Sequence, residues 1–113
     1  MTHDSITVFG DIHGNLPALQ AIVADIDARE LTNLYCLGDL VGYGTSPNEV
    51  IAIVRQLNIP TIMGNYDLGV GQDSDDCGCA YRTESARALG ERSIAWSNAH
   101  TSADNKAWLR TLV

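Results

Sequence analysis

Three short apolar runs, each followed at once by glycine and a residue with a side-chain oxygen, constrain this chain of 113 residues more than any other feature. The runs cover residues 6–9, 34–37 and 61–63, and their β-branched and bulky apolar side chains predict β-strands. The pairs that follow them are Gly10-Asp11, Gly38-Asp39 and Gly64-Asn65. Because each interval has room for one helix and two loops, the pattern predicts a βαβαβ arrangement.

Each interval between these runs carries the pattern of an amphipathic helix. Asn15 is the expected N-cap of the first helix, with Pro17 in the first turn, and its apolar stripe comprises Leu19, Ile22, Val23 and Ile26. Ser46 and Glu49 have capping-box spacing around Pro47 at the start of the second helix, whose stripe comprises Val50, Ile53, Val54 and Leu57. The chain is therefore expected to be of the α/β class, with a parallel sheet.

The side chains that follow the strands are expected to meet. Right-handed crossovers keep the strands parallel, so Asp11, Asp39 and Asn65 should lie at the carboxyl edge of one sheet, with His13 two residues after Asp11. Two close carboxylates repel each other unless a cation lies between them. Oxygen ligands joined by one imidazole suit hard to borderline divalent ions rather than the ions that thiolates select. We therefore expect a divalent metal site at this edge.

The same three segments carry a family resemblance. The sequences GDIHGN at 10–15, GDLVGYG at 38–44 and GNYD at 64–67 resemble, in order, the first three blocks of the calcineurin-like metallophosphoesterases. With DDCGCAY at 75–81, the chain looks most similar to the small bacterial phosphodiesterase-like branch of that family. The resemblance implies the N-terminal βαβαβ part of a four-layer α/β/β/α sandwich, followed by a long loop and C-terminal helices.

The resemblance also implies a set of metal ligands. In the family, residues matching Asp11 and His13 hold one ion, the residue matching Asp39 bridges two ions, and the residue matching Asn65 holds the other. The ions would be divalent, two in a complete site, and drawn from Mn, Fe, Zn, Ni or Mg. They would hydrolyse a phosphodiester or a small phosphomonoester with a metal-activated water.

Two further residues of the third block have implied roles. Many relatives place histidine after the ligand asparagine to protonate the leaving group, whereas this chain has Tyr66. Tyr66 could donate a hydrogen bond there, or it could be a packed aromatic residue whose hydroxyl bonds to the backbone. Asp67 is expected to orient the turn and the metal ligands.

The family completes its site with histidines from a second half, including a GH-x-H block, and this sequence contains no such block. His3 precedes the first strand and His100 lies in a polar stretch, so neither replaces them. We therefore expect residues 1–113 to be one domain, the N-terminal part of a metallophosphoesterase domain, with its second half absent. The alternative to an active enzyme is a truncated, catalytically incompetent oligomeric domain with an incomplete metal site. A third possibility is that a partner chain, or a longer native product, supplies the missing half. An uncovered sheet would favour a homo-oligomer.

The sequence loses its periodic pattern after Asp67. Residues 68–81 are rich in glycine and aspartate and are expected to form a long loop. Helices are expected from Thr83 onward, and Thr101 and Asp104 have the spacing of another capping box.

The cysteines and tryptophans are interpreted as structural residues. Cys36 lies in a predicted strand and is expected in the core, and Cys77 and Cys79 form a lone C-x-C pair without a second ligand pair for zinc. Trp96 and Trp108 are expected to anchor helices to the core.

Charge limits the classes of partner. The formal net charge of −7 repels nucleic-acid phosphates and anionic membranes, so neither is expected as a bulk partner. Residues 42–44 lack the G-x-G-x-x-G spacing of a nucleotide-cofactor loop. The first residues lack the basic and apolar regions of a signal peptide, which predicts a cytoplasmic protein. Besides metal ions, the expected ligand is a phosphate-ester substrate.

Overall fold

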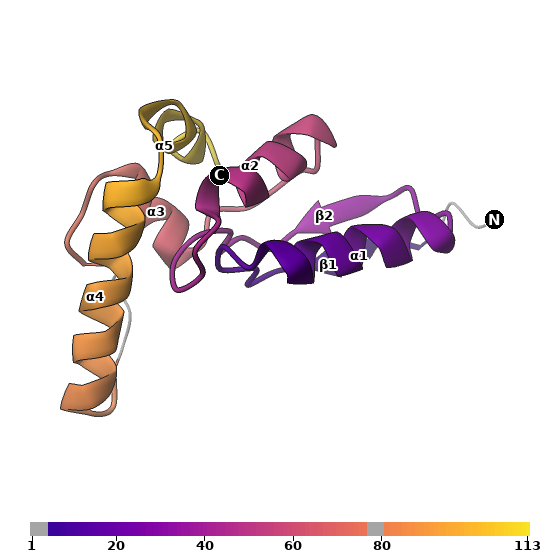
Figure 1. Cartoon of the computed structure of the whole chain (residues 1–113). Coiled ribbons are helices and arrows are strands. Elements are labelled where there is room, and N and C mark those ends of the chain that lie inside the picture. The colour runs from indigo at the N-terminus through magenta and orange to yellow at the C-terminus, as the bar shows by residue number, and fades with distance from the viewer. Residues whose placement is uncertain (1–4, 77–80) are drawn as a thin grey trace.

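The computed structural model describes residues 5–76 and 81–113 of the chain. His3, Cys77 and Cys79 lie outside the described residues. The α/β class is confirmed, since a short parallel sheet is followed by helices in the order β1, α1, β2, α2, α3, α4 and α5 (Figure 1).

The sheet is smaller than the sequence predicts. Strands β1 (Thr7–Phe9) and β2 (Leu34–Cys36) pair in parallel, with Val8 opposite Tyr35. The third predicted strand, residues 61–63, is reduced to one parallel bridge between Thr61 and Cys36. The ladder stops there because the amide of Met63 donates instead to the carbonyl of Val113, 2.8 Å away, at the end of the chain.

Two helices follow the two strands as expected. Helix α1 (Leu16–Ala28) runs along the sheet (Figure 1), and Asn15 caps it by accepting a 3.1 Å hydrogen bond from the amide of Ala18. Helix α2 (Pro47–Gln56) begins after Ser46, but the capping box predicted there is wrong, because the Ser46 side chain makes no capping hydrogen bond. The predicted stripe also needs correction: α2 ends before Leu57, which is exposed, and Ile51 is buried in its place.

The predicted loop over residues 68–81 is wrong at its beginning. Helix α3 (Asn65–Gly71) runs from the third sequence block into this segment and packs against α5. Its two glycines hid the helical pattern, yet Gly71 has a packing role. A Cβ atom at Gly71 would lie only 3.3 Å from the Cβ of Leu109, so a larger residue would crowd this helix contact.

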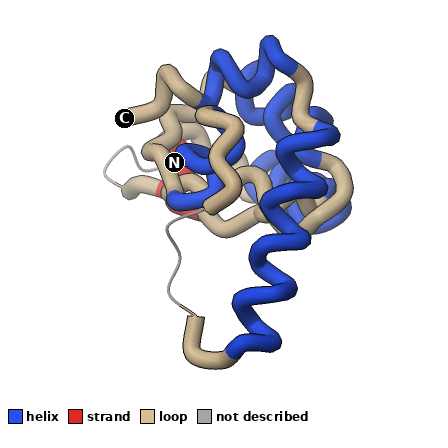
Figure 2. Tube along the Cα trace, turned by 90° about the vertical axis from the view of Figure 1, so that its left-hand side faces the viewer, coloured by secondary structure: helices blue, strands red, loops and turns tan. Residues whose placement is uncertain are grey.

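Two helices complete the described chain. Helix α4 (Glu84–His100), capped by Thr83, projects away from the sheet (Figures 1 and 2), and α5 (Ala103–Leu109) folds back onto α3. The capping box predicted at Thr101 is wrong by one residue, because the Ser102 hydroxyl caps α5 by accepting from the amide of Asn105 at 3.2 Å.

The core lies between the helices and one face of the sheet. Cys36 is buried in it and Trp108 packs against it, as expected, whereas the half-buried Trp96 stacks on His100 with 3.9 Å between ring centroids. The opposite face, here called the bare sheet face, exposes five large apolar side chains: Ile6, Val8, Tyr35, Leu37 and Ile62. None of the helices in the described part of the chain has the length and apolar character needed to cross a membrane.

Candidate metal centre

The loops after β1 and β2 run side by side beyond the strands. The amide of Asp11 donates to the carbonyl of Gly38 at 2.9 Å, and the amide of His13 donates to the carbonyl of Asp39 at 2.9 Å. The amide of Gly14 then donates to the carbonyl of Leu40 at 2.7 Å. This continued ladder fixes the two loops against each other, so residues from distant parts of the sequence meet.

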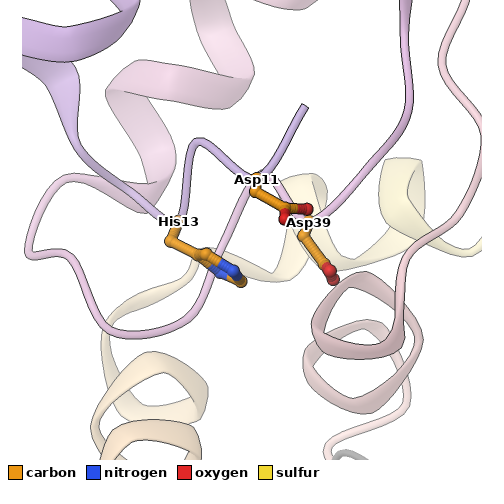
Figure 3. Close-up of side chains that lie close together, drawn as sticks. All are labelled: Asp11, His13 and Asp39. Atoms are coloured by element: carbon orange, nitrogen blue, oxygen red, sulfur yellow. The ribbon is translucent and has the colours of Figure 1, made fainter. Parts of the chain in front are cut away.

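Three side chains converge where these loops emerge. One ligand atom from each of Asp11, His13 and Asp39 lies within 4.8 Å of the other two, and Figure 3 shows the three side chains turned toward a common space. The group joins two carboxylates with one imidazole. That donor set suits a hard to borderline divalent cation, and a cation would offset the repulsion between the carboxylates.

The backbone at all three positions is in the left-handed region. The φ angles are 53° at Asp11, 49° at His13 and 55° at Asp39. Residues other than glycine seldom adopt this conformation, which costs about 1–3 kcal/mol each and is concentrated at functional sites. The hydrogen bonds between the loops hold these residues in place, so the strain is consistent with side chains aimed at a ligand.

His13 is oriented by the neighbouring loop. Its Nδ1 lies 2.8 Å from the carbonyl oxygen of Val41. Because a carbonyl oxygen only accepts, Nδ1 carries the proton of this bond, and in the neutral imidazole Nε2 is the nitrogen with the free lone pair. Metal-binding histidines are commonly held in this way, with the second ring nitrogen bonded to a carbonyl.

The start of α3 lies against Asp39. The amide of Tyr66 donates to Asp39 Oδ1 at 3.0 Å, and a Cβ atom at Gly64 would lie 2.3 Å from the same oxygen. Only glycine permits this approach. Asn65, between these two residues, is exposed at the first position of α3. The backbone of Asn65 is thus beside Asp39, and its role as a ligand stays a prediction.

Asp67 ties three backbone segments together beneath the candidate ligands. It is fully buried, and its Oδ2 accepts hydrogen bonds from the amides of Asp39 at 2.7 Å and Gly64 at 2.9 Å. Its Oδ1 accepts from the amide of Leu40 at 2.9 Å. Burial raises the pKa of the Asp67 carboxyl above its ordinary value, and these hydrogen bonds act against the rise. The geometry matches an orienting residue.

Tyr66 is buried behind His13. It is only 3% exposed, and its ring meets the His13 ring edge-on with 5.4 Å between centroids. Burial raises the pKa of the Tyr66 phenol well above its ordinary value, and the nearby Tyr43 and Tyr81 side chains add to the rise. Its buried hydroxyl makes no hydrogen bond of standard geometry with the described residues. The burial of the ring agrees with the alternative of a packed aromatic residue, and among the described residues no backbone group bonds to the hydroxyl.

A hollow of about 470 Å³ adjoins the candidate ligands. It extends from Asp11 and His13 past Tyr43 to the segments that start α1 and α2. Tyr43 is not among the site residues that the sequence predicts. The available signal was an aromatic residue between two glycines at the end of the second block.

His100 is not part of the metal group. It is the last residue of α4, where its Nδ1 lies 2.8 Å from the carbonyl oxygen of Trp96 and its ring stacks on Trp96. The expectation that His100 does not replace the missing histidines agrees with this placement.

A family model described as calcineurin-like phosphoesterase matches residues 5–110 of the chain. Uncharacterized protein MJ0912 of Methanocaldococcus jannaschii is 47% identical over 77 residues, which are 67% of this chain and 32% of that protein. A symmetrical bis(5'-nucleosyl)-tetraphosphatase of Pectobacterium atrosepticum is 36% identical over 67 residues, which are 57% of this chain and 24% of that protein. The chain thus spans a third or less of the length of these relatives.

Solved structures agree with the fold. A metallophosphoesterase from Sphaerobacter thermophilus superimposes with a TM-score of 0.69 and 30% identity, over 96% of this chain and 41% of that one. A putative diadenosine tetraphosphatase superimposes with a TM-score of 0.64 over 93% of this chain and 41% of that one. At 21% identity, the second likeness concerns the fold alone.

Proposed function

Because the chain belongs to the calcineurin-like phosphoesterase family, we propose that it serves the metal-dependent hydrolysis of a phosphodiester or a small phosphomonoester, centred on Asp11, His13 and Asp39. One observation carries the proposal. Two carboxylates and an imidazole from separate loops bring their ligand atoms within 4.8 Å of one another, in strained backbone conformations. Asp11 is exposed, so burial in the core does not account for the position of its carboxylate.

The residues fit divalent ions in kind, since they offer carboxylate oxygens and one imidazole. Asp11, His13 through Nε2, Asp39 and, as the family resemblance implies, the side chain of Asn65 would hold them. Bound there, the ions supply positive charge that lowers the pKa of a water molecule and stabilises charge on the phosphate oxygens. The identity of the ions, from Mn, Fe, Zn, Ni or Mg, is left to experiment.

Tyr66 and Asp67 are buried next to this centre and support its residues. A phenol with a raised pKa stays protonated at neutral pH, so Tyr66 is a packing partner of His13 rather than a base. Asp67 is a positioning residue, because it touches the backbone of Asp39 and Leu40 and holds them to Gly64.

The relatives suggest where to look for the substrate. Among them are symmetrical bis(5'-nucleosyl)-tetraphosphatases, so dinucleoside tetraphosphates belong among the first compounds to test. The chain covers about a quarter of those proteins. The activity of the complete protein is therefore part of the proposal.

The test is hydrolysis of bis(4-nitrophenyl) phosphate, followed by the release of nitrophenolate, with each of the five ions in turn. Turnover that requires metal and falls at least about a hundredfold in Asp39→Asn would support the proposal. Asp27→Asn, an exposed aspartate of α1, is the matched control and should keep its rate. Equal rates in wild type and Asp39→Asn would contradict the proposal, as would no turnover with any of the ions.

The bare sheet face favours association. Single exposed apolar residues are common on protein surfaces, but this face gathers five large ones. Apolar patches of this kind mark interaction sites. We propose that either a second copy of the chain or additional polypeptide of a longer protein covers this face. The oligomeric state in solution distinguishes a self-associating chain from one that requires another segment.

A further inference from the structure

Tyr43 is an exposed aromatic residue beside the candidate metal centre, and the proposed hydrolysis gives it no role. Its side chain is 55% exposed and forms part of the wall of the hollow that begins at Asp11 and His13. Its backbone has a φ angle of 61°, the left-handed conformation shared by the three candidate ligands. An exposed ring held in a strained conformation has a cost in stability without the benefit of burial.

The loop that carries Tyr43 is fixed from both sides. The amide of Tyr43 donates to the hydroxyl of Ser93 in α4 at 2.7 Å, and the amide of Gly44 donates to the carbonyl of His13 at 2.7 Å. A Cβ atom at Gly44 would lie 2.1 Å from that carbonyl oxygen, so the loop sits directly on the His13 backbone. The backbone that carries the Tyr43 ring is therefore held in place beside His13.

Other aromatic rings support Tyr43 on its protein side. Its ring centroid lies 5.3 Å from that of His13, edge-on, and 5.0 Å from that of Tyr66. Tyr66 is buried, so Tyr43 is the outermost ring of this group. The exposed ring of Tyr43 is thus the aromatic surface that this cluster offers at the edge of the metal centre.

Apart from Asp11 and His13, the side chains that line the hollow are uncharged. Among the described residues that line it there is neither lysine nor arginine, the side chains that usually hold further phosphates. Its volume of about 470 Å³ lies within the range of small-molecule sites. A phosphate held at Asp11, His13 and Asp39 would place whatever it carries next to Tyr43.

We propose that this hollow receives an aromatic ring carried by the phosphate ester, and that Tyr43 stacks against that ring and selects such substrates. The inference rests on the proposed function, because the phosphate must be held at the metal centre for its substituent to reach Tyr43. A ring attached directly to the phosphate and a nucleobase one sugar away offer the same stacking chemistry.

Binding of non-hydrolysable phosphonates to the chain in the presence of Mn²⁺, measured by calorimetry, tests the inference without relying on turnover. Methylphosphonate, phenylphosphonate and the 5′-methylenephosphonate analogue of AMP share the phosphonate and differ in the aromatic group. At least one aromatic ligand should bind about fivefold or more tightly than methylphosphonate. The aromatic ligand that is preferred identifies the source of the ring.

Variants assign the preference to Tyr43. Tyr43→Leu should reduce the preference to less than about twofold, and Tyr43→Phe should keep it, because stacking needs the ring and not the hydroxyl. Tyr35→Leu, an exposed tyrosine on the bare sheet face, is the matched control and should also keep it.

The outcomes separate this inference from the proposed function. Equal binding of all three ligands to the wild type, or an unchanged preference in Tyr43→Leu, would overturn the aromatic subsite and leave the metal centre standing. Failure of every phosphonate to bind in the presence of Mn²⁺ would overturn both.

Discussion

The carboxylate of Asp67 lies 2.7 Å from the backbone nitrogen of Asp39 and fixes the loop that presents Asp39 to the metal centre. The same carboxylate holds the amides of Leu40 and Gly64. One buried side chain thus joins the end of β2 to the start of α3. The candidate centre depends on this contact for its shape, although Asp67 is not placed among the metal ligands.

Asp67→Asn should destabilise the fold. The carboxylate accepts three backbone hydrogen bonds through two oxygens, whereas an asparagine has one oxygen and would turn its amide group toward at least one backbone donor. Leaving a buried amide unsatisfied costs about 1–3 kcal/mol, so the free energy of unfolding should fall by about 2–4 kcal/mol in urea titrations. Metal affinity should fall as well, because Asp39 loses its support.

Asp27→Asn is the control for that comparison. Asp27 is exposed on α1, and its substitution should change the free energy of unfolding by less than about 0.5 kcal/mol. If Asp67→Asn were as stable as Asp27→Asn, the hydrogen bonds of Asp67 would not be what holds the loops against each other.

Tyr66 should remain protonated far into the alkaline range. Its pKa is raised by burial, so its contribution to stability is fully present below the ordinary tyrosine pKa of about 10 and is lost as the pH rises above it. In Tyr66→Phe, the loss of stability above pH ~10 should be smaller than in the wild type. Ionisation of the tyrosines can be followed by absorbance at 295 nm. The part of this signal that is lost in Tyr66→Phe should appear in the wild type only at the pH at which the protein unfolds. If Tyr66→Phe removed phenolate absorbance at a pH below that of unfolding, Tyr66 would not be buried as described.

The bare sheet face should promote self-association of the isolated chain. Val8→Lys places a charge in the middle of this face without disturbing the core, because Val8 is 51% exposed. Sedimentation velocity should show association of the wild type with increasing concentration and a shift toward monomer in Val8→Lys. Leu89→Lys, on the exposed side of α4, should behave as the wild type does. A wild type that stays monomeric at all concentrations would favour a covering segment from a longer protein.

The sequence pattern predicted that Asp11, His13 and Asp39 lie close together, because their proximity follows from a few strong rules. Parallel strands bring their carboxyl ends to one edge, and glycine lets the chain turn there. Asn15 was recognised as a cap for a similar reason, since its effect is confined to one helical turn.

The features that the sequence did not predict depend on distant contacts. The glycines of α3 favoured the prediction of a loop. Gly71 instead allows the close approach of α5, a contact that no local sequence pattern contains. Likewise, the third strand shortens because Met63 bonds to Val113, fifty residues further along the chain. The position of Tyr43 beside the candidate metal centre was not predicted, because it depends on the loop geometry around His13.

The position of a bound ion tests the central claim most directly. Crystals grown with Mn²⁺ and measured near the manganese absorption edge should show an anomalous peak within bonding distance of Asp11, His13 Nε2 and Asp39. The peak should be absent in Asp39→Asn crystals grown under the same conditions. A peak bound to other residues, or no peak at saturating Mn²⁺, would contradict the assignment of these three side chains to one metal centre.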